Sequence, residues 1–216
     1  MTPATPPSAD DLSTIMYTSG TTGDPKGVML THRSLVHTVY SLICHSRQCA
    51  DLVFTQDDVL ISYLPLAHIF ERVNEELFTH VGGSIGYWRG DIAGLMDDLA
   101  ALRPTMLLGV PRVFDRIYAR VQQGLQQSLL RRLLFNWLFS RKKAFMMDGA
   151  PVESASWLAD TIVFSKIKGL LGGRVRVIVS GGAPIARHTE EFVRVAMCAK
   201  FVQGYGLTGE MVYGKG

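Results

Sequence analysis

The chain has 216 residues, 47% of them hydrophobic and 19% charged, with a formal net charge of +3. This composition is typical of a globular protein with one substantial core, and the charge is too small to indicate nucleic-acid binding. No apolar run approaches the ~18 residues of a membrane-spanning helix, and the Pro-rich residues 1–11 lack the features of a secretory signal. Cys44, Cys49 and Cys198 form no C-x-x-C pair, which argues against a disulfide framework or zinc site and favours a reducing compartment.

Short apolar runs that end in glycine or proline recur along the chain. Because they are rich in valine, isoleucine and leucine, we expect them to form buried strands. These runs are residues 13–18, 58–65, 103–111, 174–182 and 200–206.

Helical patterns lie between these runs. Thr31 is placed to cap a helix, and residues 95–102 and 187–198 show apolar residues at helical spacing. The expected apolar face of the first helix consists of Leu35, Val36, Val39, Leu42 and Ile43. The alternation of strands and helices predicts an α/β fold with a mostly parallel sheet flanked by helices.

Polar or glycine-rich clusters follow three of the predicted strands, at 18–27, 180–184 and 204–208. In open parallel sheets, ligands bind at the carboxyl ends of the strands. We therefore expect the three clusters to form one composite site.

The stretch YTSGTTGDPKGVMLTH, residues 17–32, combines hydroxyl side chains, three glycines and Lys26. Hydroxyl donors, close backbone approach and one mobile cation are what a polyphosphate requires. The composition alone is equally compatible with a solvated turn. The stretch is not a Walker A loop, because Pro25 and Gly27 stand where that motif needs glycine and Ser/Thr.

This stretch closely resembles the phosphate-binding signature of the adenylate-forming superfamily. Four further segments, YLPLAHIFERV (63–73), GVPRVFDRIY (109–118), SGGAPIA (180–186) and QGYGLT (203–208), are similar in sequence and order to long-chain fatty acyl-CoA synthetases. The resemblance runs from about Leu12 to Thr208. It implies that residues 12–208 form part of the large AMP-binding domain of such an enzyme, after a flexible lead-in at 1–11.

Enzymes of this family convert a fatty acid and ATP into an acyl-adenylate, and coenzyme A then displaces AMP. The resemblance therefore implies ATP, Mg²⁺, fatty acid and coenzyme A as ligands. It also implies that the protein catalyses the reaction by positioning the reactants and stabilising charge.

The resemblance also assigns roles to individual residues. It places Tyr205 against adenine, for which its flat ring is suited, Thr208 at the α-phosphate, and His68 beside the acyl carboxylate. The adenine and acyl pocket would be lined by Gly182, Ala183 and Pro184. The β- and γ-phosphates would be bound by Thr18, Ser19, Gly20, Thr21, Thr22, Gly23 and Lys26. From the residues alone, Tyr205 could be an ordinary packed tyrosine and His68 an interior histidine.

Two departures from the family pattern concern the end of the chain. The family has a magnesium-binding glutamate directly after the threonine, whereas here Gly209 intervenes and Glu210 is displaced by ~3.5 Å of extended chain. Residues 209–216 no longer follow the family, and the C-terminal lid domain is expected to be absent. We therefore expect little or no ligase turnover from this chain alone.

Residues 116–147 contain seven Lys/Arg and no Asp/Glu, with leucines and Trp137 at helical spacing. Such a segment can lie in a membrane interface, and the alternative is a surface helix with a solvated basic face. The expected basic cluster consists of Arg131, Arg132, Arg141, Lys142 and Lys143. Family resemblance points to the endoplasmic reticulum or the peroxisome.

Two other classes of function remain open, and one is excluded. Ser180 lies in IVSGG, which lacks the first glycine of a nucleophile elbow and so excludes a serine hydrolase at that site. A non-catalytic nucleotide- or acyl-binding fragment is one alternative. An acyl-adenylating enzyme that does not use coenzyme A is the other.

Overall fold

The computed structural model describes residues 5–18, 24–48, 52–147, 163–197 and 199–208, together with the backbone of 210–214. The strands are β1 (Leu12–Thr18), β2 (Lys26–Thr31), β3 (Val59–Ser62), β4 (Ser84–Tyr87), β5 (Met106–Gly109), β6 (Val177–Ser180), β7 (Lys200–Leu207) and β8 (Glu210–Gly214). The helices are α1 (His32–Gln48), α2 (Ile69–Val81), α3 (Leu95–Leu102), α4 (Pro111–Gln126), α5 (Leu129–Met147), α7 (Ser165–Leu170) and α8 (Arg187–Ala196).

Six strands form the main sheet, in the order β4-β3-β5-β6-β7-β8. The first five are parallel and β8 is antiparallel to β7. β5 and β6 are only four residues long and buried throughout, as expected for strands covered on both faces. The predicted α/β fold with a mostly parallel sheet is confirmed.

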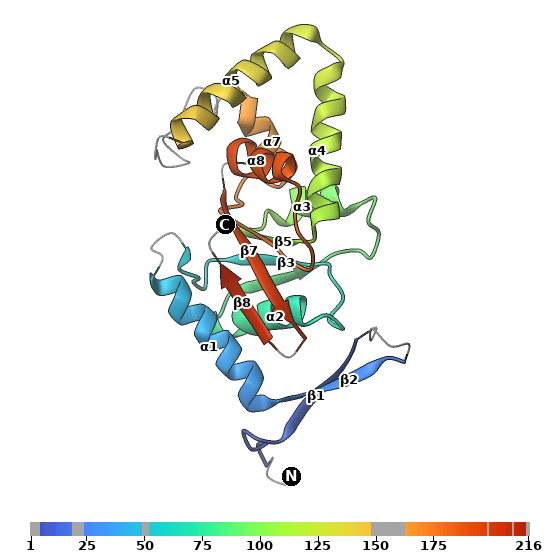
Figure 1. Cartoon of the computed structure of the whole chain (residues 1–216), viewed down its shortest axis with the longest axis vertical. Coiled ribbons are helices and arrows are strands. Elements are labelled where there is room, and N and C mark those ends of the chain that lie inside the picture. The colour runs from blue at the N-terminus through green and yellow to red at the C-terminus, as the bar shows by residue number, and fades with distance from the viewer. Residues whose placement is uncertain are drawn as a thin grey trace.

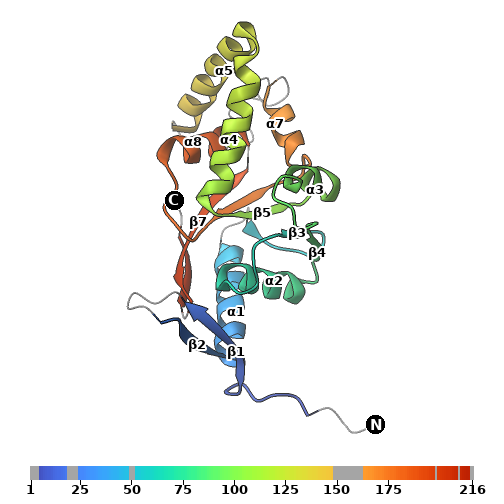
Figure 2. The ribbon, with the colours of Figure 1, turned by 90° about the vertical axis from the view of Figure 1, so that its right-hand side faces the viewer.

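Helices cover both faces of this sheet, and alternate residues of each strand supply the two cores. Ile61, Leu107 and Ile178 pack on the side of α3, α4, α5, α7 and α8. Leu60 and Leu108 pack on the other side, against α1 and α2. In Figures 1 and 2 the sheet forms the middle of the molecule, α4 and α5 extend from one end, and the β1–β2 hairpin lies at the other.

Three features of the sheets differ from the sequence prediction. β1, predicted as a buried strand, pairs antiparallel with β2 in a separate two-stranded sheet, where only Met16 of its residues is buried. β2 and β4 were not predicted at all, because glycines at 27 and 86 interrupt their apolar runs. Residues 210–214, placed in the divergent tail, form an edge strand on β7.

The predicted helices are present with small differences. Thr31 caps α1 as expected, because its Oγ1 accepts a hydrogen bond from the Ser34 backbone N–H at 3.2 Å. Val36, predicted on the buried face of α1, is instead 63% exposed. Among the described residues, no helix is both long and apolar enough to cross a bilayer.

Candidate functional site

A pocket of about 400 Å³ lies at the carboxyl edge of the parallel sheet, where open α/β sheets bind ligands. Segments that follow three neighbouring strands meet there: Leu64 to Phe70 after β3, Val110 after β5, and Gly181 and Gly182 after β6. The fourth segment is the outer half of β7. The volume of the pocket falls within the range of small-molecule sites. The lining residues are Leu64, His68, Ile69, Phe70, Val110, Gly181, Gly182, Gly204, Tyr205, Gly206, Leu207 and Thr208.

The loop after β6 can approach a ligand closely because it lacks side chains. Gly182 has φ +81°, a conformation that favours glycine. A Cβ at Gly181 would meet the Phe70 ring at 3.2 Å, so this glycine lets the strand end pack on α2. The backbone of Gly182 is therefore presented to the pocket without steric cover.

β7 extends beyond its parallel neighbours and presents its last residues to the pocket. Tyr205 is 78% exposed although it lies within a strand. Leu207 pairs with Glu210, so the chain turns back into β8 directly after Thr208. An exposed aromatic ring and a hydroxyl thus lie at the same wall of the pocket, and a planar base could stack on the ring.

His68 is the N-cap residue of α2, in an extended conformation with φ −102° and ψ 130°. Its side chain makes no capping hydrogen bond and is exposed. Because the first backbone N–H groups of a helix lack intrahelical partners and the helix dipole is positive there, this end of α2 favours an anion. The geometry suits a carboxylate or phosphate in the pocket.

Glu71, in the first turn of α2, is a buried carboxyl group that the sequence did not reveal. Burial raises its pKa to about 7. The Ser62 hydroxyl and the Tyr63 backbone N–H offset part of this effect, and the charge of Glu75 adds to it. No local sequence pattern marks such a residue, because its burial results from packing against β3.

The opening stretch lies partly outside the described residues, which exclude the predicted phosphate-binding residues Ser19, Gly20, Thr21, Thr22 and Gly23. The two flanks of the stretch are joined by β pairing: Thr18 lies opposite Lys26, and its hydroxyl donates a 3.4 Å hydrogen bond to the Lys26 carbonyl.

Lys26 is exposed and does not line the pocket described above. The hairpin that carries Lys26 lies at the end of the molecule away from α4 and α5 in both views (Figures 1 and 2).

The remaining predicted site residues are not among those that line the pocket. Ala183 and Pro184 continue the exposed loop after Gly182 but do not line the pocket. The side chain of Glu210, the displaced counterpart of the magnesium-binding glutamate of the family, lies outside the described residues. Within the part of the chain that the structure describes, no three His, Cys, Asp or Glu side chains cluster as a metal site.

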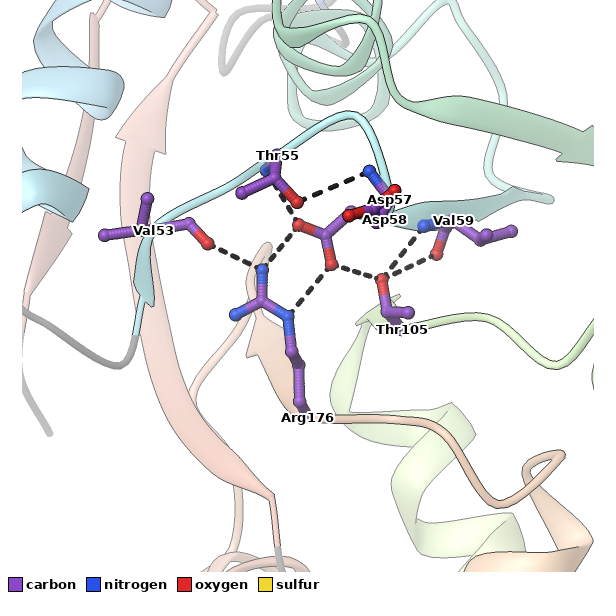
Figure 3. Close-up of polar contacts among 7 residues, drawn as sticks. All are labelled: Val53, Thr55, Asp57, Asp58, Val59, Thr105 and Arg176. Atoms are coloured by element: carbon purple, nitrogen blue, oxygen red, sulfur yellow. Dashed lines mark hydrogen bonds and ion pairs between the residues drawn. The ribbon is translucent and has the colours of Figure 1, made fainter.

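A second polar cluster, also missed by the sequence analysis, lies at the opposite edge of the sheet (Figure 3). Arg176 binds Asp58 through two hydrogen bonds, Nε to Oδ1 at 2.9 Å and Nη2 to Oδ2 at 2.6 Å. The Thr105 hydroxyl donates to Asp58 Oδ1 at 2.7 Å, and the Thr55 N–H donates to Oδ2 at 2.9 Å. Since Asp58, Thr105 and Arg176 directly precede β3, β5 and β6, the cluster connects the amino ends of three neighbouring strands.

Comparisons with known proteins identify the family of the chain. The model of a family described as AMP-binding enzyme matches residues 1–212. Long chain acyl-CoA synthetase 3 of Arabidopsis thaliana is 52% identical over 199 residues, which are 92% of this chain and 30% of that protein. The peroxisomal long chain acyl-CoA synthetase 6 of the same plant is 45% identical over 204 residues, 94% of this chain and 28% of the relative.

A solved structure shows the same architecture. The A domain of carboxylic acid reductase from Segniliparus rugosus, in complex with AMP and a co-purified carboxylic acid, matches with a TM-score of 0.70 and 27% identity. The match covers 97% of this chain and 30% of that one. The chain thus spans less than a third of the length of these proteins.

Proposed function

Because the chain belongs to the AMP-binding enzyme family, we propose that it is part of the large domain of a long-chain fatty acid–CoA ligase. The complete enzyme would activate a fatty acid with ATP to an acyl-adenylate and pass the acyl group to coenzyme A. The observation that supports this most strongly is the pocket in which His68, Gly182, Tyr205 and Thr208 meet.

Each group is assigned a role in binding or catalysis. The Tyr205 ring would stack on adenine and the Thr208 hydroxyl would donate to the α-phosphate. His68 and the free N–H groups at the start of α2 would orient the fatty-acid carboxylate and stabilise charge during attack on the α-phosphate. The hairpin that carries Thr18 and Lys26 would bind the outer phosphates.

Magnesium fits this arrangement as an ion held mainly by ATP. Mg²⁺ is commonly bound by substrate phosphates with one or two carboxylates, and the described residues offer no cluster of three ligands. Glu210 is the proposed protein ligand. Mg²⁺ would neutralise charge on the phosphates.

We propose a location at the endoplasmic reticulum or the peroxisome, in line with the peroxisomal relative. A peripheral contact between residues 116–147 and the membrane would bring the enzyme to its lipid substrate.

A second candidate is a nucleotide-binding fragment without turnover, because the chain spans only 30% of the first relative. A third is an adenylating enzyme that uses another acceptor than coenzyme A. Three measurements on the purified chain test the nucleotide site, the turnover of the chain and the acceptor: AMP binding by calorimetry, pyrophosphate release dependent on a fatty acid, and transfer of labelled acyl group to coenzyme A.

We expect AMP binding, and little or no pyrophosphate release from the chain alone. Failure to bind AMP or ATP would overturn the proposed nucleotide site. Pyrophosphate release without any acyl-CoA would favour the third candidate. Acyl-CoA formation at the rate of a full-length relative would contradict the expected lack of turnover.

A further inference from the structure

Helix α5 has two apolar stripes on different faces. The residues Phe135, Leu138, Phe139, Lys142 and Met146 recur at the i, i+3, i+4, i+7 and i+11 spacing of one helix face. Leu130, Leu133, Leu134, Trp137 and Arg141 repeat the same spacing five residues earlier, and so form another face. An ordinary surface helix has only one such stripe.

The first stripe packs against the domain. Phe135 stacks on Phe139 and contacts the edge of Phe164, and the Lys142 ammonium lies 5.4 Å from the centre of the Phe164 ring. Leu138 belongs to the same core cluster. This stripe therefore attaches α5 to the core, whereas no residue of the second stripe belongs to the core cluster.

The second stripe, here called the outer face (Leu130, Leu133, Leu134 and Trp137), is open. Leu130 is 80% exposed, Trp137 58% and Leu133 55%. In Figures 1 and 2, α5 lies at the end of the molecule farthest from the β1–β2 hairpin, beyond the sheet. Contiguous exposed apolar side chains of this kind mark interaction sites.

The charged residues of α5 itself are all basic. Residues 116–147 contain no acidic residue, and Arg131, Arg132 and Arg141 of α5 are exposed. The guanidinium of Arg141 lies 5.6 Å from the ring centres of both Trp137 and Phe145. The predicted basic cluster needs one correction, because Lys142 is buried and Lys143 binds Glu191 at 2.7 Å.

These observations favour a lipid surface over a second copy of the chain. A symmetric dimer would place the same surface on both sides of the interface, and the arginines would then face each other. An anionic bilayer accommodates both the exposed apolar side chains and the arginines, since leucine and tryptophan insert at the acyl boundary while arginines bind headgroup phosphates.

We infer that the outer face of α5 docks on an anionic membrane, with Trp137 at the level of the headgroups and Arg131, Arg132 and Arg141 on lipid phosphates. The docking is argued from α5 alone. Only its use, which is access to a fatty acid dissolved in that membrane, rests on the proposed function.

The test is binding of the 216-residue chain to phosphatidylcholine vesicles with and without phosphatidylserine, measured by cosedimentation in the absence of nucleotide and fatty acid. One variant combines Arg131→Glu, Arg132→Glu and Arg141→Glu, and its control combines Arg47→Glu, Arg112→Glu and Arg174→Glu. A second variant combines Leu130→Gln, Leu133→Gln and Trp137→Gln, and its control combines Met29→Gln, Val36→Gln and Tyr40→Gln. All these side chains are exposed, and circular dichroism checks that every variant is folded.

We expect the chain to bind the anionic vesicles and the arginine variant to bind them roughly a hundredfold more weakly. The glutamine variant should lose binding roughly tenfold or more, and both controls should bind as the parent does. In a chain with Trp88→Phe and Trp157→Phe, the emission of Trp137 should shift to shorter wavelength on binding.

Absence of binding to anionic vesicles, or equal losses in variants and controls, would overturn the inference. A dimer in sedimentation velocity that the glutamine variant dissociates would assign the outer face to a second copy instead. Because no step uses nucleotide, the inference can fail while the nucleotide site stands, and the reverse also holds.

Discussion

Glu71 has a fully buried carboxyl group next to the pocket residues Ile69 and Phe70. Its pKa rises from 4.5 to about 7 in the folded chain, so between these values the folded state binds more protons than the unfolded state. The free energy of unfolding should therefore fall as the pH rises through this window. The difference corresponds to about 3 kcal/mol.

Replacement of this carboxyl group by an amide tests the argument. Glu71→Gln cannot ionise, so the variant should lack the decrease of about 3 kcal/mol that the parent chain shows between about pH 4.5 and pH 7. Urea unfolding at a series of pH values measures it. Glu76→Gln, an exposed position on the same helix, is the control and should follow the parent. Parallel pH curves for the parent and Glu71→Gln would contradict the prediction.

Substitution of Tyr205 tests whether its ring contributes to nucleotide binding. Since stacking of a base on an aromatic side chain contributes roughly 1–3 kcal/mol, Tyr205→Ala should weaken AMP binding by a factor of roughly five to a hundred or more. Tyr205→Phe should retain most of the affinity, because the ring remains. The control is Tyr40→Ala, since Tyr40 is a similarly exposed tyrosine on α1 and lies outside the pocket. Calorimetric affinities that do not separate Tyr205→Ala from Tyr40→Ala would remove Tyr205 from the site.

At the scale of elements, the predicted cap of α1 offers a matched pair of threonines. Thr31→Ala removes the hydroxyl that accepts from the Ser34 N–H and should lower the free energy of unfolding by about 1 kcal/mol. Thr38 also has a hydroxyl on α1, but it donates to the Ser34 carbonyl one turn earlier within the helix. Thr38→Ala should be neutral or slightly stabilising, because alanine is the better helix former. Denaturant unfolding compares the two, and equal losses would show that the cap has no special role.

Elements with a strong local pattern could be predicted from the sequence, whereas their partners could not. α1, α3 and α8 follow from helical spacing, and the four-residue strands β5 and β6 follow from continuous apolar runs. β1 was recognised as a strand, but its partner β2 follows a glycine-rich stretch and gives no comparable signal. Pairing depends on contacts across the loop between the two strands, which periodicity does not describe.

At the scale of the whole molecule, the topology of the sheet explains both what the sequence indicated about the site and what it did not. Gly182 and Tyr205 could be expected to approach each other because parallel strands bring their carboxyl ends to one edge, and both line the same pocket. The Asp58–Arg176 pair joins residues 118 positions apart at the other edge. Neither residue belongs to a local motif, so no reading of the sequence could pair them.

This pair provides a test of how the sheet is held together. Burial of Asp58 alone would raise its pKa, but hydrogen bonds from Arg176, Thr105 and the Thr55 N–H outweigh burial and hold the pKa below its ordinary value. The stabilisation is therefore present above about pH 4 and is lost as the pH falls through the lowered pKa. Asp58→Asn should lower the free energy of unfolding by about 2 kcal/mol at neutral pH, less than for a fully buried pair because Arg176 is partly exposed.

The chain contains a matched control for this pair. Asp10 and Arg33 form the same two-bond contact, at 2.7 Å and 2.9 Å, but on the exposed surface. Water screens that pair, so Asp10→Asn should leave stability unchanged. Because the Asp58 cluster and the pocket lie at opposite edges of the sheet, Asp58→Asn should also keep the AMP affinity of the parent chain below its unfolding transition. If Asp10→Asn and Asp58→Asn destabilise the chain equally in urea, burial of the Asp58 pair does not strengthen it, and the pair has no special role in holding the strands together.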